Sequence, residues 1–419
     1  MFSPHEKPGL YEAFGMPEFD EMYEMYERTT SISKKKIRAQ ELFMNLLKER
    51  AETGRIYIMN IDHCTTHSSF KDKVYMSNLC QEITLPTTPV QHIDDEDGEI
   101  ALCILSAVNL GLIRDKDDLE ELCDLSVRAL DEIIDYQEYP ILAAKQSAQS
   151  RRSLGIGYIG LAHYLAKNHV AYGDKEALEL VDETTEAFQY YLLKASNQLA
   201  IEKGQCEYFE KTKYSDGILP IDTYKKDIDK IVKRKLSYDW KQLRKDIQEH
   251  GLRHSTLSAQ MPSESSSVVS NATNGIEPPR DYLSVKKSKK GTLKQIVPDY
   301  YRLKNFYTLL WDMPSNEGYI NVVATMQKYF DQAISGNWSY NPQNYKDGEV
   351  PISVMANDLL TTYKLGWKTS YYQNTYDAKT DLDEPAHPVG WHDNQKEMKS
   401  REEFESQEDY DDYCEACMI

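Results

Sequence analysis

The chain has 419 residues, of which 40% are hydrophobic and 28% charged, enough for one large core or about two to four domains. Its net charge of −19, from 49 Lys and Arg against 68 Asp and Glu, argues against a non-specific nucleic-acid binder. No apolar run could span a bilayer and no signal peptide is visible, so we expect a cytoplasmic protein (host cytoplasm if phage-encoded) without nucleic-acid or membrane partners.

Segments with helical and strand-like patterns alternate along the first 375 residues. Helical periodicity occupies three stretches, which are 33–52, 117–135 and 174–203. The region 63–98 is irregular, and 99–112 is apolar with a short period. Strand-like runs occur at 55–60, 154–159, 255–261, 294–297 and 366–372. Strands that alternate with helices predict an α/β fold with much parallel sheet.

The last 44 residues have a different composition. Residues 376–419 contain 14 acidic residues against 4 Lys and Arg, a charge of −10 out of −19. Such a segment buries too little apolar surface to order itself, so we predict two parts, a folded 1–375 and a flexible acidic tail 376–419. Cys414 and Cys417 near its end have the spacing of a dithiol that is reversibly oxidised. The alternative is a solvated terminus without a role.

The seven cysteines do not suggest a structural disulfide framework, because their number is odd and the chain looks cytoplasmic. His63, Cys64 and His67, with Cys80 and Cys103 further along the chain, are residue types that can bind zinc. Cys80 and Cys103 lie 16 and 39 residues past Cys64, whereas a closed zinc site usually has two close pairs of ligands. We therefore predict no metal site.

The run Gly155–Gly160 matches the glycine pattern of dinucleotide-binding proteins. That motif needs an apolar strand before it, but the preceding residues 146–152 are polar and basic. We predict a tight turn from a strand into a helix, with small residues where the helix packs closely on the sheet.

Asn78, Cys80 and Glu82 alternate along the chain. In extended backbone their side chains would point to one face and bring together a hydrogen-bonding amide, a thiol and a base. The alternative is an ordinary loop.

Two further motifs have both a functional and a plain interpretation. Met261–Ser266 has the chemistry of a helix start, whose free N–H groups bind anions or are simply capped. Tyr371 and Tyr372 are adjacent, but the chain has 30 tyrosines and an aromatic strand is the plain interpretation.

Together these motifs resemble the large (alpha) subunit of class I ribonucleotide reductases, most closely the aerobic bacterial and phage type that acts on nucleoside diphosphates. The resemblance extends along nearly the whole chain. Its blocks are Phe2–His5, Glu52–Tyr57, Ser77–Cys80, Gly98–Cys103, Arg152–Gly157, Met261–Ser265, Asn271–Arg280 and Tyr371–Asn374.

The resemblance implies a role for each catalytic residue. Cys80, on a finger loop inside a barrel, would become the thiyl radical that takes the ribose 3′ hydrogen. Glu82 would accept the 3′-hydroxyl proton, and Asn78 would orient the ribose hydroxyls. Cys103 would be one of the two cysteines that reduce the 2′ carbon and end as a disulfide.

The resemblance also implies substrate, radical and reductant contacts. Tyr371 and Tyr372 would pass the radical from the small subunit to Cys80. Cys414 and Cys417 would re-reduce the active-site disulfide and be reduced by thioredoxin or glutaredoxin. The loop 262–266 would hold the substrate phosphates. The residues expected to contact substrate are Asn78, Leu79, Cys80, Gln81, Glu82, Pro262, Ser263, Glu264, Ser265 and Ser266.

The resemblance covers only about the C-terminal half of the family's large subunit. It implies the C-terminal half of a ten-stranded α/β barrel, so we expect an N-terminal partner polypeptide to complete the barrel. That partner would carry the ATP and dNTP effector sites and the second reducing cysteine. We expect no cofactor in this chain, since the di-iron/tyrosyl small (beta) subunit supplies the radical. The isolated chain should be inactive. The alternative is a truncated, non-catalytic fragment that only binds the small subunit.

Overall fold

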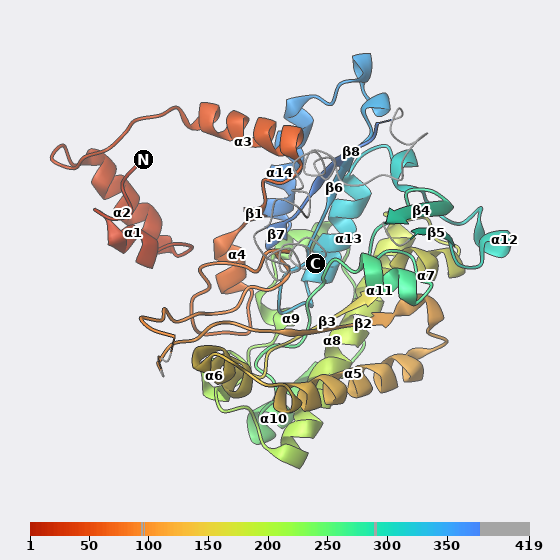
Figure 1. Cartoon of the computed structure of the whole chain (residues 1–419), viewed down its shortest axis with the longest axis horizontal. Helices are drawn as coiled ribbons and strands as arrows, with labels where there is room; N and C mark the ends of the chain where they lie inside the picture. The colour runs from red at the N-terminus through yellow and green to blue at the C-terminus, as the bar shows by residue number, and fades with distance from the viewer. Residues whose placement is uncertain (94, 96, 289–290, 378–419) are drawn as a thin grey trace, which may run out of the picture.

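A computed structural model describes residues 1–93, 95, 97–288 and 291–377 (Figure 1). The predicted redox pair Cys414 and Cys417 lies outside these residues. The longer helices are α2 (Pro17–Arg28), α3 (Ala39–Thr53), α5 (Lys116–Tyr136), α6 (Leu142–Arg151), α8 (Lys175–Lys203), α10 (Trp240–His250), α13 (Glu317–Gln327) and α14 (Ile352–Lys364). The short ones are α1 (Pro8–Glu12), α4 (Ile61–Thr66), α7 (Leu161–Lys167), α9 (Pro220–Thr223), α11 (Glu264–Val269) and α12 (Tyr300–Leu303).

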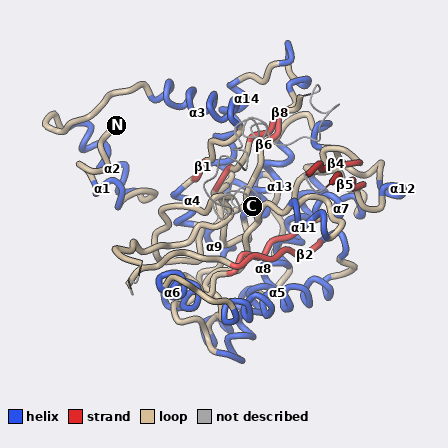
Figure 2. Tube along the Cα trace, viewed as in Figure 1, coloured by secondary structure: helices blue, strands red, loops and turns tan. Residues whose placement is uncertain are grey.

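The strands are short and separated by long connections (Figure 2). They are β1 (Ile58–Met59), β2 (Ile104–Asn109), β3 (Leu154–Ile159), β4 (Leu283–Ser288), β5 (Gly291–Ile296), β6 (Trp338–Tyr340), β7 (Thr369–Ser370) and β8 (Gln373–Thr375). β1 pairs with β7, and β4 pairs with β5, both in antiparallel fashion. The predicted run 294–297 therefore belongs to a hairpin and not to the parallel sheet.

Five neighbouring segments run parallel and form the centre of the fold. β2 lies beside β3, with Ile104 opposite Leu154. Segment 256–260 follows, because Ile156 bridges Ser258 in parallel. Gln260 in turn bridges Ile334, and the chain continues into β6, which pairs in parallel with β8. Within the described ranges these segments do not close on themselves, so they form a partial barrel.

The helices predicted over 117–135 and 174–203 and the strand predicted over 154–159 are confirmed, the strand with the predicted bounds. The runs 55–60 and 366–372 contain only the two-residue strands β1 and β7, and 255–261 forms only isolated bridges. The first helix is an exception, since α3 begins at Ala39 and not at residue 33. The reason is that Lys34 donates to the carbonyl oxygens of Tyr26, Glu27 and Thr29 at the end of α2. The patterns also missed α2 itself. Figure 1 shows α1 and α2 beside the main body, joined to α3 by an extended connection.

The glycine motif is a strand-to-helix turn, as predicted. Gly160 has φ +75° and precedes α7. A Cβ on Gly157 would lie 2.5 Å from the carbonyl oxygen of Ala259, so glycine is required for the close approach of segment 256–260. A Cβ on Gly155 would lie 3.0 Å from the Sγ of Cys103.

Helices cover one face of the central segments. The long helix α8 packs against α5, α10 and α13, and its buried side chains join the main apolar core. Among the residues that the structure describes, none of the helices has both the length and the apolar character needed to cross a bilayer.

Two buried charged side chains tie the central segments together. The Asp331 carboxylate accepts hydrogen bonds from the N–H groups of Leu257 and Ser258, both at 2.9 Å. The Lys368 ammonium donates to three successive carbonyl oxygens, those of Phe330, Asp331 and Gln332. Burial lowers the pKa of Lys368 to about 7. Segment 330–335 is thus fixed between its neighbours, and it supports the candidate site.

Candidate active site

The motif residues 78–82 form a tight turn, which corrects the expectation of extended backbone. Gln81 has φ 70°, in the left-handed region. The Asn78 Oδ1 accepts from the N–H of Ile83 at 3.1 Å, and the Asn78 N–H donates to the Ile83 carbonyl oxygen at 3.0 Å. Asn78 therefore closes the turn. Cys80 lies at its tip, where Leu79 is exposed, and Glu82 lies on its buried returning side.

Hydrogen bonds fix this turn against the central segments. The N–H of Ala333 donates to the carbonyl oxygen of Glu82 at 2.9 Å. The Ser335 hydroxyl donates to the carbonyl oxygen of Cys80 at 2.5 Å. The Thr369 hydroxyl lies 3.0 Å from the carbonyl oxygen of Gln81. Three consecutive carbonyl groups of the turn are held in this way.

A group of three tyrosines reaches the turn from the other side. The Tyr371 hydroxyl donates to the Cys80 Sγ at 3.5 Å. The rings of Tyr371 and Tyr372 have centroids 4.2 Å apart, and the Tyr57 ring lies 4.7 Å from the first and 5.4 Å from the second. The adjacent tyrosines are thus part of a cluster that ends at the thiol.

The surroundings of the turn raise the pKa of both the Glu82 carboxyl group and the Cys80 thiol. Burial raises the pKa of Glu82, although hydrogen bonds from Asn78 and Ser335 oppose the shift. Burial also raises the pKa of the Cys80 thiol, opposed by Tyr371 and reinforced by Glu82. A nucleophilic cysteine needs a lowered pKa. This thiol instead retains its hydrogen.

Cys103 lies just before β2 and packs against a small apolar cluster that includes Ile83 of the turn. It is partly buried. Burial and the nearby negative charge of Glu82 raise the pKa of Cys103 well above its usual value. The structure therefore brings Cys103 to the same end of the central segments as Glu82, with the space left by Gly155 beside it.

The loop 262–266 continues directly from segment 256–260. The helix predicted to start here is α11, which begins at Glu264. Pro262, Ser265 and Ser266 are exposed. The Ser263 hydroxyl is buried and has no hydrogen-bond partner within the described part of the chain.

His63, Cys64 and His67 each have a contact other than a metal. His63 Nδ1 lies 2.9 Å from the Trp367 carbonyl oxygen. The Cys64 thiol donates to the Lys368 carbonyl oxygen at 3.6 Å. Both ring nitrogens of His67 have hydrogen-bond partners. In the described ranges no cluster of three or more His, Cys, Asp or Glu is arranged to hold a metal ion.

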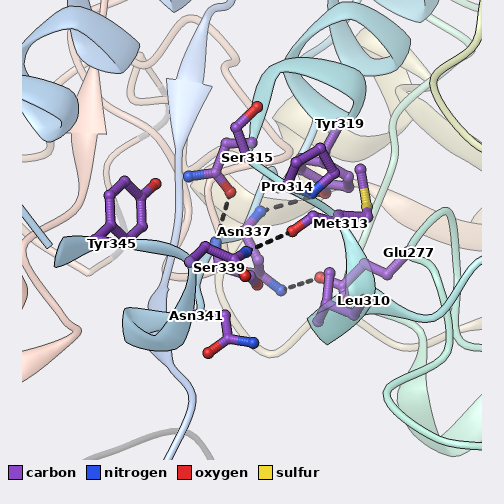
Figure 3. Close-up of a pocket in the computed structure, with 12 residues that line it drawn as sticks. Glu277, Leu310, Met313, Pro314, Ser315, Tyr319, Asn337, Ser339, Asn341 and Tyr345 are labelled. Atoms are coloured by element: carbon purple, nitrogen blue, oxygen red, sulfur yellow. Dashed lines mark hydrogen bonds between the residues drawn. The ribbon is translucent and has the colours of Figure 1, made fainter. Parts of the chain in front are cut away.

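Figure 3 shows a pocket lined by Glu277, Tyr319 and Asn337 among others, whose volume of about 420 Å³ includes space open to solvent. Asn337 in its wall accepts from the N–H of Tyr372 at 3.1 Å and donates to the Glu277 carboxylate at 2.5 Å. Burial raises the pKa of Glu277. The pocket thus connects to the main chain of the tyrosine pair.

Arg50 supports the tyrosine pair from beneath, and the sequence interpretation missed it. Its guanidinium is fully buried, and it donates to the carbonyl oxygens of Ile56, Tyr371 (2.8 Å) and Tyr372 (3.4 Å). It also stacks on the Trp338 ring at 4.9 Å. Burial lowers the pKa of Arg50 to about 10, so it remains charged at pH 7.

Replacing Arg50 with methionine should lower the free energy of unfolding by about 3 kcal/mol, because buried carbonyl groups lose their donor. Urea unfolding of the full chain measures this. Arg38→Met, at the exposed start of α3, is the matched control and should change stability by less than about 0.5 kcal/mol. Equal urea midpoints for Arg50→Met and the unaltered chain would contradict the assignment.

Tyr57 and Ser335 were also missed. Tyr57 lies in a block that the resemblance included, without a role. Ser335 follows the apolar pair Ala333-Ile334, and this run is too short to predict a strand. Their importance depends on contacts between segments 255 or more residues apart, such as Ser335 with Cys80.

Comparison of the sequence with known proteins shows the family to which the chain belongs. Residues 1–373 match the model of the ribonucleotide reductase barrel domain. The chain is 59% identical over 92% of its length to the ribonucleoside-diphosphate reductase subunit alpha of Haemophilus influenzae, and 56% identical over 93% to subunit alpha of reductase 1 of Escherichia coli. Identity to the subunit alpha of phage T4 is 44% over 90%. The chain spans about half the length of these relatives. It belongs to the ribonucleotide reductase family and comprises sequence of that family's barrel domain.

Proposed function

We propose that the chain is the C-terminal, catalytic part of a ribonucleoside-diphosphate reductase, which makes deoxyribonucleotides for DNA synthesis by radical chemistry. The observation that carries the proposal is the contact of the Tyr371 hydroxyl with the Cys80 thiol at 3.5 Å, in the turn that buries Glu82. A tyrosine cluster that ends at a protonated thiol suits hydrogen-atom transfer better than nucleophilic attack.

In the proposed reaction the Cys80 thiyl takes the ribose 3′ hydrogen and Glu82 accepts the 3′-hydroxyl proton. The 2′-hydroxyl then leaves as water. Cys103 and a second cysteine supply two electrons and two protons, one of them to the departing hydroxyl group, and become a disulfide. Glu82 returns its proton to the 3′ oxygen, and the 3′ hydrogen returns from Cys80. Asn78 orients the ribose hydroxyls, and the loop 262–266 binds the phosphates. Tyr371 and Tyr372 convey the radical.

The proposed complex contains an N-terminal polypeptide, which completes the barrel, and the small (beta) subunit with its di-iron/tyrosyl centre. In support, β2 has a strand neighbour on one side only within the described residues, and Leu102 and Leu105 beside that edge are 39% and 42% exposed. A free strand edge with apolar side chains favours a partner that adds to it. Thioredoxin or glutaredoxin would reduce Cys414 and Cys417, and effectors would bind to the partner.

The test is reconstitution of the full chain with an N-terminal alpha-subunit polypeptide, a small subunit, thioredoxin and a ribonucleoside diphosphate. We expect deoxyribonucleotide to form only when all components are present. Turnover without the N-terminal polypeptide would refute the need for a partner. Assembly without any turnover would favour the alternative, a fragment that only binds the small subunit.

A further inference from the structure

The Ser335 hydroxyl lies between two parts of the turn. Its Oγ is 2.5 Å from the carbonyl oxygen of Cys80 and 3.3 Å from the Oε2 of Glu82. The side chain is buried, with 7% exposure of the residue. One hydroxyl group therefore contacts both the main chain that carries the thiol and the carboxyl group of the proposed base.

A hydroxyl group has one hydrogen to donate. At 2.5 Å that hydrogen goes to the Cys80 carbonyl oxygen, so an Oγ lone pair faces Glu82. A protonated Glu82 can donate to this lone pair, whereas an ionised Glu82 requires the hydroxyl to turn toward it. The ionised form would thus leave the Cys80 carbonyl group without its donor.

We propose that Ser335 is a positioning residue, which couples the protonation of Glu82 to the hydrogen bond between the Ser335 hydroxyl and the Cys80 carbonyl oxygen. With Glu82 protonated, Ser335 donates to the Cys80 carbonyl oxygen and the tip of the turn is held. With Glu82 ionised, Ser335 donates to the carboxylate and the tip is released. The inference rests on the proposed function only in that it assigns Glu82 and Cys80 to the reaction.

The other groups that face Glu82 do not make this connection. They are the Asn78 amide, the Cys80 thiol and the Cys103 thiol. The Thr369 hydroxyl, 3.0 Å from the carbonyl oxygens of both Gln81 and Ile334, makes no hydrogen bond with Glu82 in the described part of the chain. The coupling is therefore specific to the carbonyl group of Cys80.

The test follows the carbonyl stretch of Glu82 by infrared difference spectroscopy of the reconstituted complex across pH. The band is identified by its loss in Glu82→Gln. Ser335→Ala removes a charge-assisted hydrogen bond from the ionised form but only a weaker, neutral one from the protonated carboxyl group. The titration midpoint should therefore rise by about one pH unit, tenfold in proton affinity. The acid limb of kcat/KM should move upward by the same amount.

Two further variants provide the controls. Ser335→Thr keeps the hydroxyl and should keep the original midpoint. Ser370→Ala removes a buried hydroxyl that has no hydrogen-bond partner among the described residues, and it should leave the midpoint unchanged. If Ser335→Ala does not assemble, Ser335→Cys, a weak donor of similar size, replaces it with the same expected rise.

An unchanged midpoint in Ser335→Ala, or in Ser335→Cys where it takes its place, or an equal shift in Ser370→Ala, would overturn the inference. The titration needs no turnover, so its result is independent of the proposed reaction. Full activity of Glu82→Gln would refute the proposed role of Glu82. An unchanged titration midpoint in Ser335→Ala would refute only the coupling.

Discussion

Replacing Cys80 with serine should reduce turnover of the reconstituted complex to background, at least about 10⁴-fold, while the complex assembles normally. Serine is close in size and can still accept a hydrogen bond from Tyr371. Its O–H bond is stronger than S–H, so the radical cannot form at this position. Product formation and gel filtration measure the two halves of this expectation.

Cys123→Ala is the matched control for this substitution. Cys123 is buried in the core on α5, away from the turn. Its replacement should cost stability but leave turnover per assembled complex unchanged. Residual turnover of Cys80→Ser above that of a mixture without small subunit would contradict the role of Cys80.

Replacing Tyr371 with phenylalanine should also abolish turnover without loss of assembly. The ring contacts with Tyr57 and Tyr372 remain, but the hydroxyl that donates to the Cys80 Sγ is lost. Burial and the hydrogen bond to Cys80 raise the pKa of Tyr371, so the phenol holds its proton in the resting state. Radical transfer therefore requires a hydrogen atom to pass from Cys80 to the tyrosyl oxygen, and phenylalanine offers no such oxygen.

A tyrosine elsewhere provides the comparison. Tyr164 donates to or accepts from the Thr184 hydroxyl at 3.1 Å and is partly buried. Tyr164→Phe loses a similar hydrogen bond and should retain turnover. The result that contradicts the prediction is substantial product formation by Tyr371→Phe under conditions in which Cys80→Ser forms none.

The elements that were predicted well are those whose signals are local. β3 and α8 have strong apolar patterns, and glycines mark their ends. The wrong start predicted for α3 depends on a contact with the helix before it, which periodicity does not show. Residues 33–38 do not join α3, because Lys34 binds carbonyl groups at the end of α2.

The candidate site was predicted as a set of residues but not as a geometry. Alternation suggested extended backbone at 78–82, and the left-handed Gln81 makes it a turn. No local pattern places Cys80 beside Tyr371, which is 291 residues away. Only the resemblance to a family connected them. No sequence pattern marks Arg50 or Ser335, because their roles depend on the carbonyl groups that they contact in the folded chain.

The distances along the chain between contacting groups have a consequence for synthesis in the cell. Arg50 meets the Tyr371 carbonyl oxygen across 321 residues, and Cys80 meets the Tyr371 hydroxyl across 291. Ribosomes add about 5–20 residues per second. The thiol therefore emerges roughly 15–60 seconds before its tyrosine exists. If Tyr371 conveys the radical as proposed, a nascent chain has no tyrosine through which a radical could pass to Cys80 until residue 371 has been added.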